Sequence, residues 1–135
     1  MSDCVFCKIV KGEISSYKIY EDDSFFAFLD ISPRNLGHTL VIPKKHYRWV
    51  WDVENIGNYY EVVKDIANAI KRACNTDYIV STVFGEDVPH AHVWLIPRYK
   101  NDGHGDAIDL ENVKKFSESE MKNIAKEISQ QIKIK

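Results

Sequence analysis

The sequence predicts an α+β fold in which helices pack on an antiparallel sheet, and two observations support this prediction. Short segments rich in β-branched and aromatic residues lie on both sides of one long segment whose apolar residues recur every three or four positions. A second helical pattern closes the chain. Strands that are grouped in this way are typical of α+β proteins. The 135 residues have the length of a single domain, residues 1–135.

The first part of the chain predicts a short helix and three strands. The helix is expected over residues 4–12, because Gly12 favours a helix end. The strands are expected over residues 17–22, 24–30 and 38–43. An acidic turn joins the first two strands, residues 30–37 form a turn-rich connection, and Pro43 closes the third strand.

The middle of the chain predicts the long helix and two further strands. The helix is expected over residues 54–74, where one apolar stripe has helical spacing. The stripe comprises Ile56, Tyr59, Tyr60, Val63, Ile66, Ala67 and Ile70. The next strands are expected over residues 77–84 and 87–97, which are β-branched or alternating.

Residues 99–135 are expected to form a C-terminal extension. Residues 99–112 are polar and contain glycine, so they predict a loop. His104 is too isolated in this loop to be assigned a role, although a histidine in a flexible loop could approach the pocket. Ser117 and Glu120 predict a capping box that starts a terminal helix. The apolar face of that helix comprises Met121, Ile124, Ala125, Ile128 and Ile132.

Composition excludes several classes of protein. Apolar residues make up 44% of the chain and charged residues 28%, which argues against disorder. No apolar run approaches the ~20 residues of a membrane-spanning helix. A net charge of −2 argues against a nucleic-acid partner. Three cysteines, an odd number, fit a reducing compartment, and the N-terminus lacks a signal-peptide pattern, so we expect a cytoplasmic protein.

Two histidines on the predicted strand 87–97 are candidate site residues. Alternate side chains of a strand share a face, so His90, His92 and Trp94 are expected to point the same way. The opposite face comprises Ala91, Val93 and Leu95. Two neighbouring imidazoles suit acid–base chemistry or metal binding, whereas structural, hydrogen-bonded histidines are the alternative.

The segment "PHAHVWLIPR" resembles the signature of the histidine triad (HIT) family, whose core is His-x-His-x-His followed by apolar residues. The segments "CVFCKIVKGEI" and "FAFLDISPRNLGHTLVIPKKH", the long helix and "IPRYK" resemble the same family in the same order, so the resemblance covers nearly the whole chain. It implies the HIT-like α+β fold, with a five-stranded antiparallel sheet, one long central helix and a C-terminal helix. It also implies a homodimer.

The resemblance further implies a purine nucleotide substrate that is cleaved at its α-phosphorus. The middle histidine of the family's triad, which corresponds to His92, attacks the phosphorus and forms a covalent nucleotidyl-histidine. Water or another acceptor then releases the nucleotide. His90 corresponds to the first triad histidine, and His38 in "GHTLVIP" to a histidine that supports the triad. Phosphoramidates and dinucleoside polyphosphates are the expected substrates.

A nucleotide pocket is implied by the same resemblance. Asp30 matches a carboxylate that accepts hydrogen bonds from ribose, and Glu86 and Asp87 match positions that help to hold phosphate. Carboxylates at those two positions would repel a phosphate unless they point away or meet a cation. The positions that sandwich the base are Phe6, Ile9, Ile14, Phe28, Ile31 and Leu40. Judged without the family, these apolar residues are equally typical of a core.

The chain departs from the family pattern at Trp94, which stands where the third histidine is expected. An indole donates one hydrogen bond but cannot titrate, so it cannot protonate a leaving group. The expected activity is therefore a slow hydrolase, or a nucleotidyl transferase similar to the hexose-1-phosphate uridylyltransferases, which carry glutamine at this position. The alternative is a catalytically weak or inactive nucleotide-binding module that contains zinc.

The pair Cys4 and Cys7 predicts a structural zinc site together with His46 and His90. Two thiolates and two imidazoles supply tetrahedral ligands for Zn²⁺, and bacterial-type relatives with an N-terminal Cys-x-x-Cys have a similar arrangement. Unligated thiols and a redox dithiol or an interaction protein built on the pair are the alternatives. A redox pair normally starts a helix that follows a strand, and only three residues precede Cys4.

Overall fold

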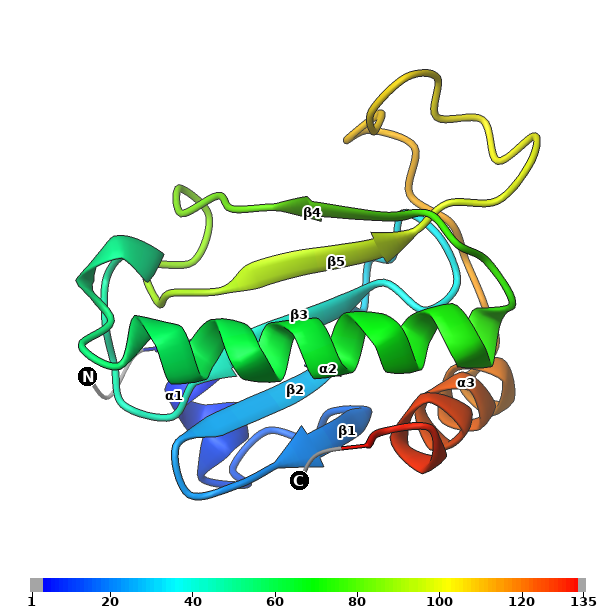
Figure 1. Cartoon of the computed structure of the whole chain (residues 1–135). Coiled ribbons are helices and arrows are strands. Elements are labelled where there is room, and N and C mark those ends of the chain that lie inside the picture. Colours follow the sequence, from blue (N-terminus) through cyan, green and yellow to red (C-terminus); the bar gives the residue numbers. More distant parts are fainter. Residues whose placement is uncertain (1–3, 134–135) are drawn as a thin grey trace.

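The structure, a computed structural model, describes residues 4–133. These residues contain five antiparallel strands and three α-helices (Figure 1). The strands are β1 (Lys18–Glu21), β2 (Phe25–Leu29), β3 (Thr39–Pro43), β4 (Ile79–Thr82) and β5 (Val93–Pro97). The helices are α1 (Val5–Val10), α2 (Ile56–Cys74) and α3 (Glu118–Gln130), and a short 3₁₀ helix covers Val50–Asp52. The sheet order is β1-β2-β3-β5-β4. The predicted α+β class is confirmed.

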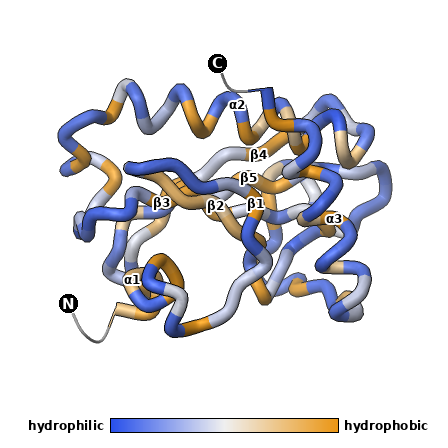
Figure 2. Tube along the Cα trace, turned by 90° about the horizontal axis from the view of Figure 1, so that it is seen from below, coloured by the Kyte–Doolittle hydropathy of each residue, from blue (hydrophilic) through white to orange (hydrophobic). Residues whose placement is uncertain are grey.

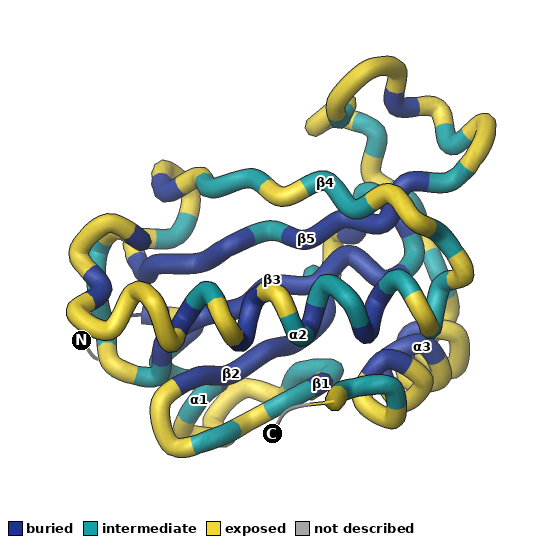
Figure 3. The backbone as a smooth tube through the Cα atoms, in the orientation of Figure 1, coloured by how far each residue is buried: buried dark blue, intermediate teal, exposed yellow. Residues whose placement is uncertain are grey.

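The helices cover both faces of the sheet, with α1 on the face opposite to α2 (Figure 2). Alternation along β2 divides the core accordingly: Phe25, Ala27 and Leu29 pack with α2 and α3, whereas Phe26 and Phe28 pack with α1. All five residues of β2 are buried, as are those of β3 (Figure 3). The sheet therefore has a smaller core on the α1 face and a larger core on the α2 face.

Polar contacts fix α2 and α3 in place. The hydroxyl of Tyr59, which is fully buried in α2, donates to the carbonyl oxygen of Val41 at 2.6 Å. The capping box predicted for α3 is confirmed, because the Ser117 hydroxyl accepts from the backbone N–H of Glu120 at 3.0 Å and the Glu120 carboxylate accepts from the N–H of Ser117 at 2.9 Å. None of the helices within residues 4–133 has the length and apolar character needed to cross a bilayer.

The strand predicted over residues 87–97 is wrong in extent, because β5 contains only Val93–Pro97. The last pairs of its two ladders are Val41 with Val93 and Thr82 with Trp94. Before Val93, β4 has already ended, and the N–H of Ala91 donates to the carbonyl of Tyr47 instead of a strand neighbour. His90 and His92 therefore precede the strand.

The alternation that the sequence predicts nevertheless continues through this segment, since Ala91, Val93 and Leu95 all lie in the core beneath α2. The other strands are shorter than predicted by one or two residues at one or both ends. Ile56, expected in the buried stripe of the long helix, is 37% exposed because it opens the first turn of α2.

The predicted loop 99–112 contains no helix or strand, and a buried carboxylate organises it. Asp102 accepts from the Arg98 guanidinium, with Nε at 2.8 Å, and from the backbone N–H groups of Tyr99 and His104. The Asn35 side-chain amide donates to the same carboxylate at 3.0 Å. These bonds attach the loop to the connection between β2 and β3.

Candidate functional site

A cavity of about 710 Å³ lies on the α1 side of the sheet, among α1, the connection after β2 and the loop after β4. Phe6 and Phe28 meet edge to face at 5.4 Å between ring centroids and form an aromatic wall. The residues expected to bind nucleotide all line this cavity: Phe6, Ile9, Ile14, Phe28, Asp30, Ile31, Leu40 and Asp87. Ile31 is 81% exposed and so lies at the rim. An apolar slot with a few polar groups at one end is typical of a small-ligand site.

His92 lines the cavity with one ring nitrogen already bonded. Its Nδ1 lies 2.7 Å from the carbonyl oxygen of His90. Because a carbonyl can only accept, Nδ1 carries the proton and Nε2 keeps its lone pair. Burial lowers the pKa of His92 below its ordinary value, although the hydrogen bond to His90 and the carboxylates of Asp30 and Asp87 oppose this effect. The arrangement is a neutral imidazole whose Nε2 is free to act as a nucleophile.

His90 is fully buried and turns toward the two cysteines rather than the cavity. Its Nε2–H donates to the carbonyl of Pro43 at 2.8 Å, so the lone pair is on Nδ1. That Nδ1 lies 3.3 Å from Cys4 Sγ and 3.5 Å from Cys7 Sγ. Burial lowers the pKa of His90 to about 4, which keeps the ring neutral. A backbone carbonyl that fixes the tautomer of a histidine in this way is typical of a metal ligand.

Cys4, Cys7, His46 and His90 present four ligand atoms that all lie within 4.8 Å of one another. Cys7 Sγ lies 3.3 Å from His46 Nδ1. Bond lengths of ~2.3 Å to sulfur and ~2.0 Å to nitrogen place S and N about 3.5 Å apart in a tetrahedral zinc site. The donor set and its spacing therefore fit a structural metal ion with no position left for a substrate.

The same surroundings disfavour a redox role for the cysteines. Both are free thiols, and burial, together with a hydrogen bond to Cys4, raises the pKa of Cys7 to about 11. A thiol with a raised pKa is a poor nucleophile at neutral pH. A bound cation would reverse this effect by stabilising the thiolates.

His38 lies behind the cavity, where it is fully buried. Its Nδ1 accepts from the backbone N–H of Arg34 at 3.1 Å, so the proton is on Nε2, 3.7 Å from Asp30 Oδ2. Burial lowers the pKa of His38 to about 3, so the ring is neutral. Asp30 accepts from the N–H of Ser32 at 2.7 Å, and burial raises the pKa of Asp30. His38 thus lies between the Asp30 carboxylate and the ring of Trp94, which is 4.6 Å away, and its buried Nε2–H has no hydrogen-bond partner among the described residues.

Trp94 forms part of the cavity wall, with three side chains around its ring. His38 meets the indole at 4.6 Å and Phe84 at 5.1 Å, both edge to face. The guanidinium carbon of Arg34 lies 5.0 Å from the ring centroid, in cation–π geometry. The indole is therefore a packed surface inside the site.

Two residues of the site were not identified by sequence reasoning. Arg34 lies in the connection 30–37, where turn residues mask any periodic signal, and it lines the cavity. His104, to which the sequence assigned no role, is buried and supports Arg34 instead of lining the cavity. Its Nε2–H donates to the Arg34 carbonyl at 2.7 Å, and its Nδ1 accepts from the N–H of Asp109.

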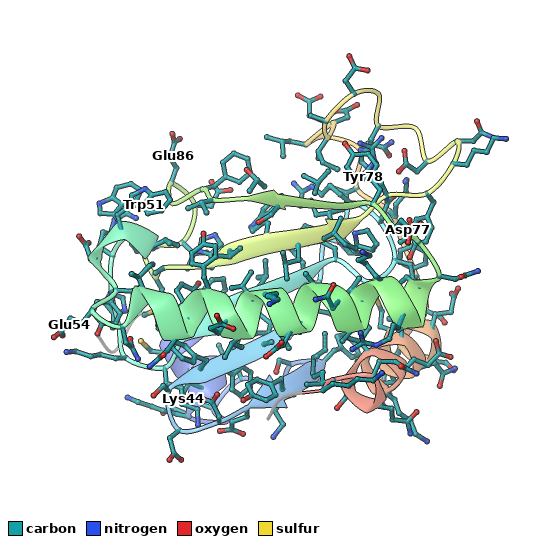
Figure 4. All side chains as sticks on the ribbon, in the orientation of Figure 1. Lys44, Trp51, Glu54, Asp77, Tyr78 and Glu86 are labelled. Carbon is teal, nitrogen blue, oxygen red and sulfur yellow. The ribbon has the colours of Figure 1, made fainter. Side chains whose placement is uncertain are left out.

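Glu86 and Asp87 line the mouth of the cavity, and both are exposed. Neither forms an ion pair within residues 4–133. The Glu86 side chain points away from the sheet at the tip of the loop after β4 (Figure 4).

Comparison with known sequences gives consistent matches. The family model of the HIT domain matches residues 11–101. An uncharacterized HIT-like protein of Borreliella burgdorferi is 43% identical over 134 residues, covering 90% of this chain and 96% of the relative. An adenosine 5′-monophosphoramidase of Schizosaccharomyces pombe is 35% identical, covering 96% and 98%. An adenylylsulfatase of Arabidopsis thaliana is 37% identical, covering 75% of this chain and 55% of the relative.

Solved structures have the same fold. A Hit-like protein from Bartonella henselae superposes with a TM-score of 0.81 at 32% identity, covering 98% of both chains. A Zn-bound histidine triad family protein from Mycobacterium smegmatis superposes with a TM-score of 0.75 at 30% identity, covering 96% of this chain and 95% of the neighbour.

Proposed function

The chain belongs to the HIT domain family, and on that premise we propose that it is a nucleotide hydrolase or nucleotidyl transferase in which His92 attacks the α-phosphorus. The observation that carries this proposal is the hydrogen bond from His92 Nδ1–H to the His90 carbonyl, which leaves a nucleophilic Nε2 beside the cavity. Related proteins that hydrolyse adenosine phosphoramidate and adenylyl sulfate support a substrate of this class.

The proposed reaction has two steps. The Nε2 lone pair of His92 forms a bond to the α-phosphorus while the bond to the leaving group breaks, giving a nucleotidyl-histidine. Water or another acceptor then displaces His92 and loses one proton. Within the cavity, Phe6 and Phe28 hold the base, and Asp30 accepts hydrogen bonds from the ribose. The Nδ1–H bond fixes the ring of His92 through both steps.

A fluorogenic adenosine phosphoramidate tests this proposal. We expect slow turnover by the wild type and none by His92→Ala, with rapid-quench mass spectrometry detecting adenylylated protein only when His92 is present. Trp94→His restores a titratable group where the leaving group departs, and we expect a rise of about 10²-fold in kcat, the low end of general-acid effects. Wild-type turnover that survives His92→Ala would contradict the proposal.

A noncatalytic nucleotide-binding module is the second candidate, and Trp94 is the observation that favours it. The indole fills its place with packed contacts to His38, Phe84 and Arg34, and it offers no proton to a leaving group. Nucleotide binding without turnover in the wild type and in Trp94→His would identify this module.

We further propose that Cys4, Cys7, His46 and His90 hold a structural Zn²⁺. The support is the fit of the four ligand atoms to tetrahedral geometry and a zinc-bound relative of the same fold. Metal analysis of purified protein, with Cys7→Ser as the control, tests this assignment. A purine base and a homodimer stay predictions from the family resemblance, and a cytoplasmic location stays a prediction from the odd number of cysteines and the N-terminal sequence.

A further inference from the structure

The charges around the cavity are unbalanced. Three carboxylates line it, those of Asp30, Glu86 and Asp87. Arg34 is the only lysine or arginine among its described lining residues. Because the indole of Trp94 cannot titrate to a cation, Arg34 is the lining group that meets negative charge on a ligand as a permanent full cation.

Arg34 is held by neutral partners alone. Its Nε and Nη2 donate to the carbonyl of Leu110 at 3.0 and 2.8 Å, and its Nη1 donates to the carbonyl of Ser32 at 2.8 Å. These bonds use three of the five N–H donors of a guanidinium, so two remain. No carboxylate forms an ion pair with Arg34 within the described residues. The Asp30 carboxylate acts on Arg34 only at longer range, without an ion pair, so the guanidinium keeps its charge and two donors available to a ligand.

The backbone of Arg34 is fixed on both sides. Its N–H donates to His38 Nδ1 at 3.1 Å, and its carbonyl accepts from His104 Nε2–H at 2.7 Å and from Lys114 Nζ at 3.2 Å. The guanidinium lies over the indole of Trp94, which is two residues beyond His92 and lines the same cavity. A cation with this support loses little rotational freedom when it meets an anion.

We propose that Arg34 binds the leaving group of the nucleotide, and that the site prefers nucleotides whose α-phosphate is joined to another acid, such as sulfate or phosphate, over those joined to an amine. This inference rests on the proposed function. Trp94 stands where a third histidine is expected, so Arg34 determines which leaving group the site prefers. Trp94 and the Leu110 carbonyl hold the guanidinium in place.

The chemistry of the two leaving groups explains the preference. When His92 Nε2 forms its bond to phosphorus, a sulfate or phosphate departs with the P–O electron pair as an anion and needs no proton. An amine departs with the P–N electron pair and must gain a proton in the same step. The indole N–H of Trp94 does not titrate, so Trp94 cannot act as the general acid. Charge-assisted hydrogen bonds from Arg34 to the departing oxygens strengthen as negative charge develops on them.

The test compares adenylyl sulfate with an adenosine phosphoramidate in wild type, Arg34→Gln and Arg34→Lys. We expect Arg34→Gln to lower kcat/KM for adenylyl sulfate by about 10²-fold, the effect of removing one preorganised donor, and to lower kcat/KM for the phosphoramidate by a much smaller factor. Arg34→Lys retains part of the preference, because it keeps the charge and loses the fork. Arg72→Gln is the matched control, since Arg72 also donates to a backbone carbonyl, that of Gln131, and lies outside the cavity.

If neither the wild type nor any variant turns over either substrate, the proposed function is refuted, but the assignment of Arg34 is not. Binding measurements test Arg34 in that case. By calorimetry, wild type is expected to bind α,β-methylene-ADP more tightly than AMP, and Arg34→Gln to abolish that difference. The assignment of Arg34 is overturned if Arg34→Gln lowers kcat/KM equally for both substrates or does not lower it for either. It is also overturned if Arg34→Gln leaves the difference in affinity between α,β-methylene-ADP and AMP unchanged. Circular dichroism checks that the variants fold.

Discussion

Replacing Asp102 with alanine is expected to lower the free energy of unfolding by about 3–5 kcal/mol. The carboxylate of Asp102 is 6% exposed and accepts from Arg98 Nε at 2.8 Å and Nη2 at 3.2 Å. It also accepts from the backbone N–H groups of Tyr99 and His104 and from the Asn35 amide. Its removal leaves the Arg98 guanidinium, which is 8% exposed, without its ion-pair partner, and this is the main cost.

Urea denaturation followed by circular dichroism at neutral pH measures this change. The control is Glu118→Ala, which breaks an ion pair with Lys122 whose two side chains are 71% and 66% exposed, so its effect should stay below about 0.5 kcal/mol. A loss for Asp102→Ala that matches the control would refute the view that this buried pair holds the C-terminal extension in place.

The pH dependence of the same variant gives a second measurement. Hydrogen bonding to Arg98 holds the pKa of Asp102 well below its usual range. A carboxylate whose folded pKa is lower than its unfolded pKa of ~3.9 stabilises the protein above that pH and loses the contribution as pH falls. The difference in stability between wild type and Asp102→Ala should therefore narrow below about pH 4.

The remaining predictions concern the metal cluster, a crowded glycine and a buried histidine. A chelator should lower the melting temperature of the wild type and leave that of Cys7→Ser unchanged. Gly37→Ala should cost about 2 kcal/mol in urea denaturation, because the φ of Gly37 is +96° and a Cβ would lie 2.8 Å from the Cys74 sulfur; Gly12→Ala, at φ +80° with open space around it, should cost less. Since burial lowers the pKa of His38 to about 3, the His38 contribution to the free energy of unfolding should fall by about 1.4 kcal/mol per pH unit between ~6.5 and about 3, and His38→Gln should lack this component while that of His90 remains.

Much of the fold was predictable because it depends on local periodicity. Short segments of sequence are enough to predict the apolar stripe of α2, the capping box of α3 and the strands β2 and β3. The extent of β5 was not predictable in this way. Alternation runs through His90 and His92, but a ladder also needs neighbours, and β4 and β3 no longer pair with that segment.

The site was predictable only in part for the same reason. The cluster of Cys4, Cys7, His46 and His90 is signalled by residue types that few other roles require. Arg34 carries no such signal, since its place depends on Leu110, 76 residues away in sequence, and on the ring of Trp94. The role of His104 could not be predicted either, because its partner is a backbone carbonyl, which any residue supplies.

Helix α1 contributes side chains to two sites. Cys7 belongs to the cluster of Cys4, Cys7, His46 and His90, while Phe6 and Ile9 line the cavity, and the Phe6 ring lies 5.3 Å from that of His92. An ion that fixes this helix would preorganise the cavity wall, so ion and nucleotide should bind with positive coupling. Thermodynamic reciprocity then requires the nucleotide to tighten retention of the ion by the same factor, which makes occupancy of one site a reporter of the other.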